Sequence, residues 1–143
     1  MATLEKAIEI AARAHAGQVD KAEQPYILHP LRVMFRVAGA HERMAAVLHD
    51  VVEDTSVTLE DLRQQGFPEE VLEAVDVLTK QDGETRTEAA RRAVQHPIAR
   101  RVKIADVTDN MDVSRLDQLT EHDVQRMKEY VEVLAILRAH GAT

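Results

Sequence analysis

Residues 45–55, AAVLHDVVEDT, place four side chains that can bind a metal or move a proton directly behind an apolar run. His49 and Glu53 are four residues apart, and so are Asp50 and Asp54. On a helix each pair lies on one face, so the two pairs form adjacent polar stripes bordered by apolar side chains. Carboxylates in such surroundings are neutralised or destabilise the fold, unless a divalent cation keeps them ionised. The stretch therefore indicates a metal site, and the alternative is a solvated helix end whose acids bind nothing.

Two further segments place polar groups in apolar surroundings. Asp106 lies inside the apolar run of VKIADVTDNM, with Asn110 one turn later, and His29 lies between apolar residues in PYILHP. Taken singly, the aspartate could be a buried cap or half of an ion pair, and the histidine a core residue. Taken with the first stretch, they predict a metal site of two imidazoles and two carboxylates: His29, His49, Asp50 and Asp106. This set suits Mn²⁺, Fe²⁺ or Zn²⁺ better than Ca²⁺ or Mg²⁺, and such an ion can polarise a phosphoryl group.

Helices must position these groups, because the apolar period is helical almost throughout the chain. We predict an all-α fold, a compact bundle of about seven to eight helices in a single domain over residues 1–143. The expected helices cover 4–15, 31–38, 42–53, 59–65, 69–80, 88–95, 97–111 and 123–140. Thr58 with Asp61 and Thr120 with Asp123 are capping-box candidates. VKIADV is the one stretch for which a strand competes.

The composition narrows the classes of function. The chain has 143 residues, 45% of them apolar, and no cysteine, which excludes disulfides and thiolate zinc sites. Its net charge of −7 disfavours non-specific binding to nucleic acids or anionic membranes. The sequence contains neither a signal-peptide core nor an apolar run near the ~20 residues of a membrane span, so we expect a cytoplasmic protein without a nucleic-acid or membrane partner. An anionic ligand would need a metal ion or locally placed cations.

Three segments, PYILHP, LHDVVEDT and VKIADVTDNM, resemble the signature segments of HD-domain phosphohydrolases. They are most similar to those of the hydrolase domain of RelA/SpoT proteins and of their small single-domain relatives, including metazoan SpoT homologues. The similarity runs from about Ala11 to Arg115. It implies an all-α HD-domain fold and the Mn²⁺-dependent removal of the 3′-pyrophosphate from (p)ppGpp, a small phosphorylated nucleotide, to give GDP or GTP and pyrophosphate.

The resemblance also implies a role for each matching residue. Glu53 and Asp54 match a pair that orients and activates the attacking water. Lys21 would face a substrate phosphate, and Asn110 would lie near the nucleoside. Arg115, just past the helix that carries the last aspartate, is a further phosphate candidate. The metal ligands would be His29, His49, Asp50 and Asp106.

Two departures in the loop before His29 leave the base specificity open. Many RelA/SpoT hydrolases have Arg-Lys where this chain has Asp20-Lys21, and their arginine stacks on guanine. An acid there could instead accept from a base edge or repel phosphate. Glu23 stands where glycine is common, which predicts a different loop backbone.

These departures motivate one alternative function, and a second comes from another class. The first is an HD phosphohydrolase that acts on another phosphorylated nucleotide or metabolite. The second is a catalytically idle nucleotide-binding module. An idle module predicts the loss of a metal ligand or of the Glu-Asp pair, whereas all six positions are filled.

The remaining polar residues are expected to lie outside the site. Asp109 and Asp112 are interpreted as exposed neighbours of the metal-binding helix, and His15 and His41 as helix-terminal or surface histidines. Most of a basic cluster is expected to be solvated, with one or two members able to reach a polyphosphate. This cluster consists of Arg91, Arg92, Arg100, Arg101 and Lys103.

Overall fold

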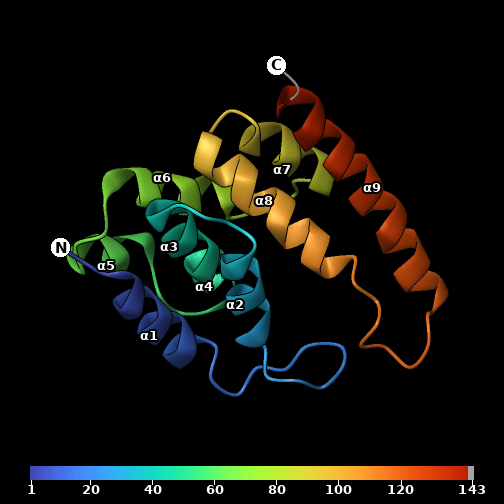
Figure 1. Cartoon of the computed structure of the whole chain (residues 1–143), viewed down its shortest axis with the longest axis horizontal. Helices are drawn as coiled ribbons and strands as arrows, with labels where there is room; N and C mark the ends of the chain where they lie inside the picture. The colour runs from blue at the N-terminus through green and yellow to red at the C-terminus, as the bar shows by residue number, and fades with distance from the viewer. Residues whose placement is uncertain (142–143) are drawn as a thin grey trace.

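The computed structural model describes residues 1–141, which form helices and their connections (Figure 1). The helices are α1 (Leu4–Ala14), α2 (Leu28–Phe35), α3 (Ala40–Leu48), α4 (Val51–Asp54), α5 (Leu59–Gln64), α6 (Glu69–Leu78), α7 (Arg86–Ala93), α8 (Pro97–Asn110) and α9 (Glu121–Gly141). Within residues 1–141 the one extended pairing is an isolated bridge between Val19 and Pro25. The prediction of an all-α fold is confirmed, and VKIADV lies within α8. None of the described helices combines the length and the apolar character that crossing a membrane requires.

Both predicted capping boxes begin helices. The hydroxyl of Thr58 accepts from the backbone N–H of Asp61 at 3.0 Å, and the carboxylate of Asp61 accepts from the N–H of Thr58 at 2.9 Å. Thr120 and Asp123 make the same reciprocal pair at 3.2 and 2.9 Å. Each box satisfies N–H groups that have no partner within the helix, which explains why α5 and α9 begin where they do.

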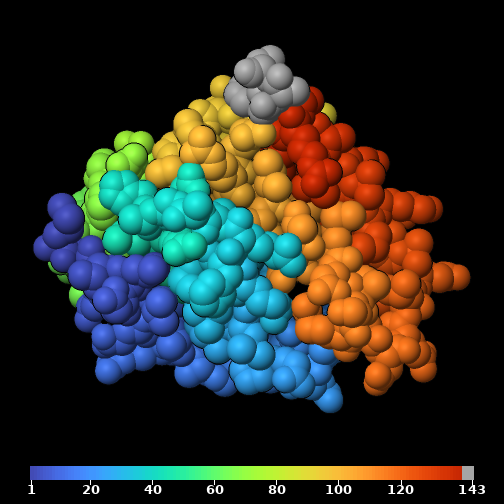
Figure 2. All heavy atoms as spheres, in the orientation of Figure 1, coloured from blue at the N-terminus to red at the C-terminus, as the bar shows by residue number. Residues whose placement is uncertain are grey.

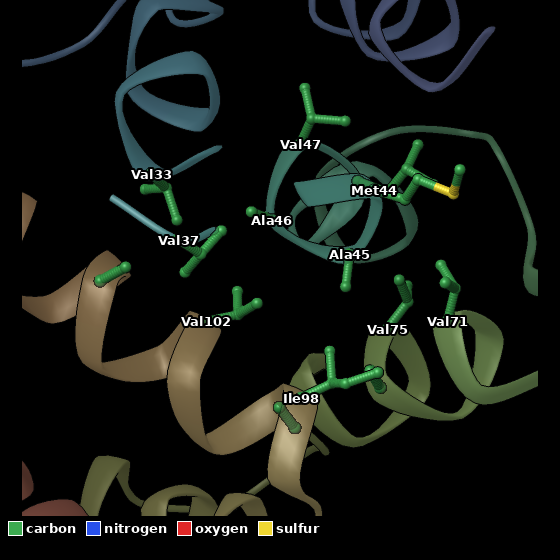
Figure 3. Close-up of a cluster of buried hydrophobic side chains, with 14 of the residues drawn as sticks. Val33, Val37, Met44, Ala45, Ala46, Val47, Val71, Val75, Ile98 and Val102 are labelled. Carbon is green, nitrogen blue, oxygen red and sulfur yellow. The ribbon is translucent and has the colours of Figure 1, made fainter. Parts of the chain in front are cut away.

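The core is built around α3, whose residues 45–48 are all fully buried. This helix packs against α1, α2, α6 and α8. Figure 3 shows aliphatic side chains such as Val33 from α2, Val75 from α6 and Val102 from α8 gathered around it. Because Ala45 and Ala46 are small, the neighbouring helices can approach α3 closely. The C-terminal end of α3 is therefore held from several sides, directly before His49 and Asp50.

The single helix expected over 42–53 is divided in the structure. α3 ends at Leu48, and a turn at His49 and Asp50 leads into the single turn of α4. The backbone N–H of His49 donates to the carbonyl of Ala46 at 3.4 Å, and Nδ1 of the same histidine lies 2.5 Å from that oxygen. Two bonds to one carbonyl tighten the chain locally. The break turns both His49 and Asp50 toward the interior.

The helix that carries His29 begins earlier than expected. α2 starts at Leu28 rather than at residue 31, because the N–H of Leu28 donates to Pro25 at 3.1 Å and that of His29 donates to Tyr26 at 3.0 Å. Pro30 does lie in the first turn, where its missing N–H costs no hydrogen bond. His29 is therefore part of the helix, and its side chain projects from α2 in a defined direction.

Two long connections lie side by side at one end of the molecule, the segment 15–27 before α2 and the segment 111–120 before α9. In Figure 1 the blue and orange connections run along the same end, and Figure 2 shows their surfaces meeting at the lower edge of this face. The Lys21 ammonium lies 3.0 Å from Oδ1 of Asp123, which ties the first connection to the start of α9. The surface between them is therefore made by loops rather than by the core.

Candidate metal centre and adjoining cavities

Four side chains converge where α2, the turn after α3 and α8 meet. Nε2 of His29 lies 2.9 Å from Oδ1 of Asp106 and 3.9 Å from Oδ2 of Asp50. Nε2 of His49 lies 3.0 Å from the same Asp50 oxygen and 3.3 Å from the same Asp106 oxygen. One ligand atom from each of the four lies within 4.8 Å of the others. The structure thus brings together all four residues that the sequence predicts as metal ligands.

The donor atoms of this cluster fit a divalent transition metal. His49 is 3% exposed, and its Nε2 is buried without a hydrogen bond. Its Nδ1 faces the carbonyl of Ala46, which directs the proton to that nitrogen and leaves Nε2 for a ligand. Two imidazoles with two carboxylates match the preferences of Mn²⁺, Fe²⁺ and Zn²⁺. A metal ion would satisfy a buried nitrogen that makes no hydrogen bond and lies beside two carboxylates.

The charges within the cluster shift one another's protonation. Burial alone would lower the pKa of His49, but the carboxylates of Asp50 and Asp106 outweigh it and raise that pKa well above its usual range. Burial would likewise raise the pKa of Asp106, but the Lys103 ammonium and His49 hold it well below its usual range. In the metal-free protein the cluster therefore holds protons on its imidazoles and charge on its carboxylates.

The predicted water-activating pair lies on α4 at the rim of the cluster. Asp50, Glu53 and Asp54 each offer an oxygen within 4.8 Å of the others. Oε1 of Glu53 accepts from the backbone N–H of Lys80 at 2.6 Å, so this carboxylate is already oriented. Partial burial and repulsion from Asp50 and Glu53 raise the pKa of Asp54 to about 6. Asp54 is thus suited to accept a proton near neutral pH.

Tyr26 is a site residue that the sequence analysis missed. Its hydroxyl donates a hydrogen bond to Oδ2 of Asp50, the oxygen that faces both cluster histidines. Burial, followed by the charge of Asp50, raises the pKa of Tyr26, so the phenol remains a donor. Its ring lies between those of His15 and His29, with centroids 4.9 and 5.7 Å away. Its position three residues before His29 was the available signal.

A cavity of about 300 Å³ opens beside the cluster, and three cationic side chains are among the residues that line it. Lys103 confirms that a member of the basic cluster reaches the site, since its ammonium lies 3.2 Å from Oδ2 of Asp106. Lys80 and Arg86 also line the cavity and were not anticipated. Lys80 ends the predicted helix 69–80 and Arg86 lies in the break that follows it, and the packing of α6 and α7 against α8 brings this part of the chain to the site. The cavity can therefore receive an anionic ligand.

The predicted substrate contacts divide between this cavity and a second one of about 270 Å³. Asn110 lines both cavities, and its amide donates to Oδ1 of Asp106 at 3.3 Å. Of these two cavities, Lys21 and Arg115 line the second and not the first. Tyr26 and Tyr130 lie at the shared wall. A ligand that spans both cavities would extend from the metal cluster to the loops.

The carboxylate of Asp20 makes its hydrogen bonds within the loop 15–27 itself. Its Oδ1 accepts from the backbone N–H groups of Ala22 and Gln24 at 2.8 and 3.0 Å. Glu23 follows with φ 61°, in the left-handed region that favours glycine. The loop thus contains a glycine-like turn at a residue with a side chain, and the carboxylate of Asp20 stabilises that turn.

One interpretation is wrong. Asp109 was expected to be exposed, but it is fully buried between α8 and α2. Its acidic side chain suggested a solvent-exposed position, whereas two arginines, one on α2 and one at its end, compensate its charge. Asp112, in contrast, is exposed as predicted. His15 does end α1, as expected for a helix-terminal histidine, although it is buried there.

Known proteins similar to this chain act on guanosine nucleotides by name. This chain is 37% identical over 147 residues to the GTP pyrophosphokinase of Streptomyces coelicolor, and the aligned region covers 94% of this chain and 17% of that protein. It is 34% identical over 123 residues to the bifunctional (p)ppGpp synthase/hydrolase SpoT of Escherichia coli strain K12, covering 76% of this chain and 17% of that protein. The chain thus spans less than a fifth of the length of these curated relatives.

A solved structure and a family match cover nearly the whole chain. The structure is that of a metazoan ortholog of SpoT, which is described as hydrolysing ppGpp and playing a role in starvation responses. It superposes with a TM-score of 0.79 at 26% sequence identity, over 96% of this chain and 86% of that one. Residues 7–139 match the HD domain family. With the helical fold and the cluster of histidines and aspartates described above, this match places the chain in the HD domain family.

Proposed function

We propose that this protein is a Mn²⁺-dependent hydrolase that removes the 3′-pyrophosphate from (p)ppGpp, giving GDP or GTP and pyrophosphate. Residues 1–143 would act as a single HD-type domain on this small phosphorylated nucleotide. One observation carries the proposal: a cluster of two histidines and two aspartates, in which a buried imidazole nitrogen makes no hydrogen bond, opens into a cavity lined in part by cations. The net charge of −7 disfavours nucleic-acid and membrane partners, and we place the reaction in the cytoplasm.

The cluster would hold the metal, and its own residues keep the ligand atoms in place. His29, His49, Asp50 and Asp106 supply the ligands. A divalent cation held there polarises a phosphoryl group and lowers the pKa of water. The hydrogen bonds from Tyr26 to Asp50 and from Asn110 to Asp106 orient the carboxylates.

Glu53 and Asp54 would handle the attacking water. The water oxygen attacks the phosphorus attached to the 3′ oxygen, and the bond between that phosphorus and the 3′ oxygen breaks. Asp54, whose pKa is near 6, accepts a proton from the water, while Glu53, held by the Lys80 amide, orients it. The 3′ oxygen takes up a proton from solvent and leaves as the nucleoside hydroxyl, Asp54 releases the proton that it accepted, and the other product is pyrophosphate.

The two adjoining cavities match the two ends of such a substrate. Lys80, Arg86 and Lys103 can balance the charge of the 3′-pyrophosphate beside the cluster. Asn110 lies at the shared wall, where a nucleoside between the phosphates would sit. Lys21 and Arg115 would then bind the 5′ phosphates in the second cavity.

Product analysis tests the proposal. The purified full chain, loaded with Mn²⁺ and incubated with ppGpp, is expected to release GDP and pyrophosphate in equal amounts, and EDTA is expected to stop the reaction. Chromatography of the nucleotide and a pyrophosphate assay measure the two products separately. Release of single phosphates, or turnover that EDTA leaves unchanged, would contradict the proposal.

The loop before α2 supports a second candidate, a hydrolase of the same reaction class with another phosphorylated nucleotide or metabolite as substrate. Asp20 stabilises the turn at Glu23 and offers no stacking surface for a base. A panel of guanosine and adenosine 3′-phosphorylated nucleotides distinguishes the two candidates. Faster turnover of a nucleotide other than (p)ppGpp would favour the second, and Asp20→Arg would then be expected to shift the preference toward guanosine.

A further inference from the structure

Asp109, a buried aspartate that the proposed reaction does not use, lies directly behind the metal cluster. Its Oδ2 lies 2.7 Å from Nδ1 of His29, and the residue is 0% exposed. On the other side of the same ring, Nε2 of His29 lies 2.9 Å from Oδ1 of Asp106. Asp106 and Asp109 are three residues apart on α8, so one face of this helix contacts both nitrogens of the imidazole.

One arginine on α2 and another at its C-terminal end compensate the charge of Asp109. Nε of Arg32 donates to Oδ1 of Asp109 at 2.8 Å, and the guanidinium of Arg36 lies 3.7 Å from the same oxygen. His29 and Arg32 are three residues apart on α2 and Arg36 directly follows its last residue, so all three lie on the side of this segment that meets α8. Both oxygens of Asp109 are therefore engaged, one with the arginines and one with His29.

We propose that Asp109 is a positioning residue for His29. By accepting from the N–H at Nδ1, it holds the tautomer whose lone pair is on Nε2 and fixes the plane of the ring toward the cluster. A carboxylate behind a metal-binding histidine controls both the tautomer and the orientation, and its loss weakens metal binding. The inference rests on the proposed metal site and adds to it a residue from the neighbouring turn of α8.

Direct measurement of Mn²⁺ binding to the metal-free full chain tests this role without a substrate. Asp109→Asn is expected to raise the Kd for Mn²⁺, measured from the electron paramagnetic resonance signal of the free ion, by about 10- to 100-fold. Asp112→Asn is the matched control, because it makes the same chemical change at an exposed position three residues later. Its Kd is expected to equal that of the wild type. Wild-type affinity in Asp109→Asn would overturn the inference.

A double-variant cycle shows whether Asp109 acts through His29. In a His29→Ala background, Asp109→Asn is expected to cause no further loss of affinity, because the ring that it positions is gone. A further loss as large as that in the wild-type background would overturn the inference. If His29→Ala itself binds Mn²⁺ as tightly as the wild type, the proposed metal site fails. If His29→Ala weakens binding and Asp109→Asn does not, only the positioning role fails.

Two variants separate positioning from a purely structural role. Arg32→Met keeps the contact between Asp109 and His29, so it is expected to lower the Tm but to leave the Kd for Mn²⁺ close to that of the wild type. An equal loss of affinity would show that the docking of α2 on α8 matters, and would overturn the inference. If Asp109→Asn does not fold, Asp109→Leu/Arg32→Met removes both charges together. That variant is expected to fold and to show the same loss of Mn²⁺ affinity, and unchanged affinity would refute the role.

Discussion

The two cavities share a wall but are built in different ways. The first is bounded by helices, and its polar groups are buried and held by neighbours: His49 by a backbone carbonyl, Asp50 by Tyr26 and His29 by Asp109. The second lies between two connections and the start of α9, where the Lys21 side chain is 46% exposed and its ammonium pairs with Asp123. The shape of the first cavity therefore depends mainly on the packing of helices, and that of the second mainly on the two connections.

This difference separates the chemistry of the site from the choice of substrate. A metal cluster needs several ligand atoms fixed within a few tenths of an ångström, which packed helices provide. Recognition of the rest of a ligand tolerates more variation, and loops on a rigid scaffold supply it. If this division holds, changes at the helical cavity should remove the reaction, and changes at the loop cavity should only adjust substrate affinity.

The largest effect is expected at the cluster itself. Asp50→Ala removes the carboxylate oxygen that faces both histidines and that would bind the metal. It is expected to lower kcat with ppGpp by roughly 10³-fold or more, since a metal supplies several kcal/mol to such a reaction. Elemental analysis should show the loss of bound Mn²⁺ while circular dichroism stays helical. A variant that keeps more than a tenth of the wild-type rate would contradict the comparison.

A smaller loss is expected for the water-handling pair on α4. Asp54→Asn is expected to lower kcat by roughly 10²- to 10⁴-fold without the loss of Mn²⁺ expected for Asp50→Ala, because it removes a proton acceptor rather than a ligand. Glu53→Gln should cost less, since its side-chain carbonyl can still accept from the Lys80 N–H. The measurements are kcat and the Kd for Mn²⁺. Equal loss of Mn²⁺ in Asp54→Asn and Asp50→Ala would place Asp54 among the ligands.

The affinity of the helical cavity for Mn²⁺ should rise with pH. Carboxylates overcome the effect of burial and raise the pKa of His29, and raise that of His49 well above its usual range, so the metal-free cluster keeps protons to higher pH than free imidazoles and a metal must displace them. Affinity is then lost as pH falls and gained as pH rises, by up to about tenfold per pH unit for each proton released. Calorimetry at pH 7 in buffers of different ionisation enthalpy counts the protons. Binding without proton release would show that the imidazoles are already neutral.

The smallest effect is expected at the loop cavity. Lys21→Ala removes an exposed cation that we propose as a phosphate contact, and it is expected to raise KM for ppGpp by about two- to fivefold with kcat unchanged. Added salt should reduce the difference. Arg13→Ala on α1 is the control, because this arginine is exposed and lines neither cavity. A fall in kcat for Lys21→Ala as large as that for Asp54→Asn would mean that the two cavities are not separate in function.

Local patterns in the sequence predicted much of the fold. Thr58 and Thr120 were recognised as helix starts because a capping box is a contact between residues three apart. The break at His49 was not, because a histidine side chain bonding back to a carbonyl leaves no mark on the apolar period. Helix ends set by side chains in this way depend on the packed environment.

The candidate site shows the same limit. His29, His49, Asp50 and Asp106 were predicted because a polar group within an apolar run must be compensated, and a cation is one such compensation. Asp109 was misjudged because a carboxylate compensated by arginines on another helix looks in the sequence like any exposed acid. Lys80 and Arg86 were missed because only the packing of α6 and α7 brings them to the cavity.

By itself, the sequence determined the helical class of this protein, most of its helix ends and the identity of the groups able to hold a metal, because these depend on residue type and short-range spacing. Tertiary structure alone decided that Asp109 stands behind His29, that Tyr26 reaches Asp50, and that the two cavities meet. Those contacts join residues far apart in the chain. Their distances follow from how α2, α3 and α8 pack together, and no local pattern records that packing.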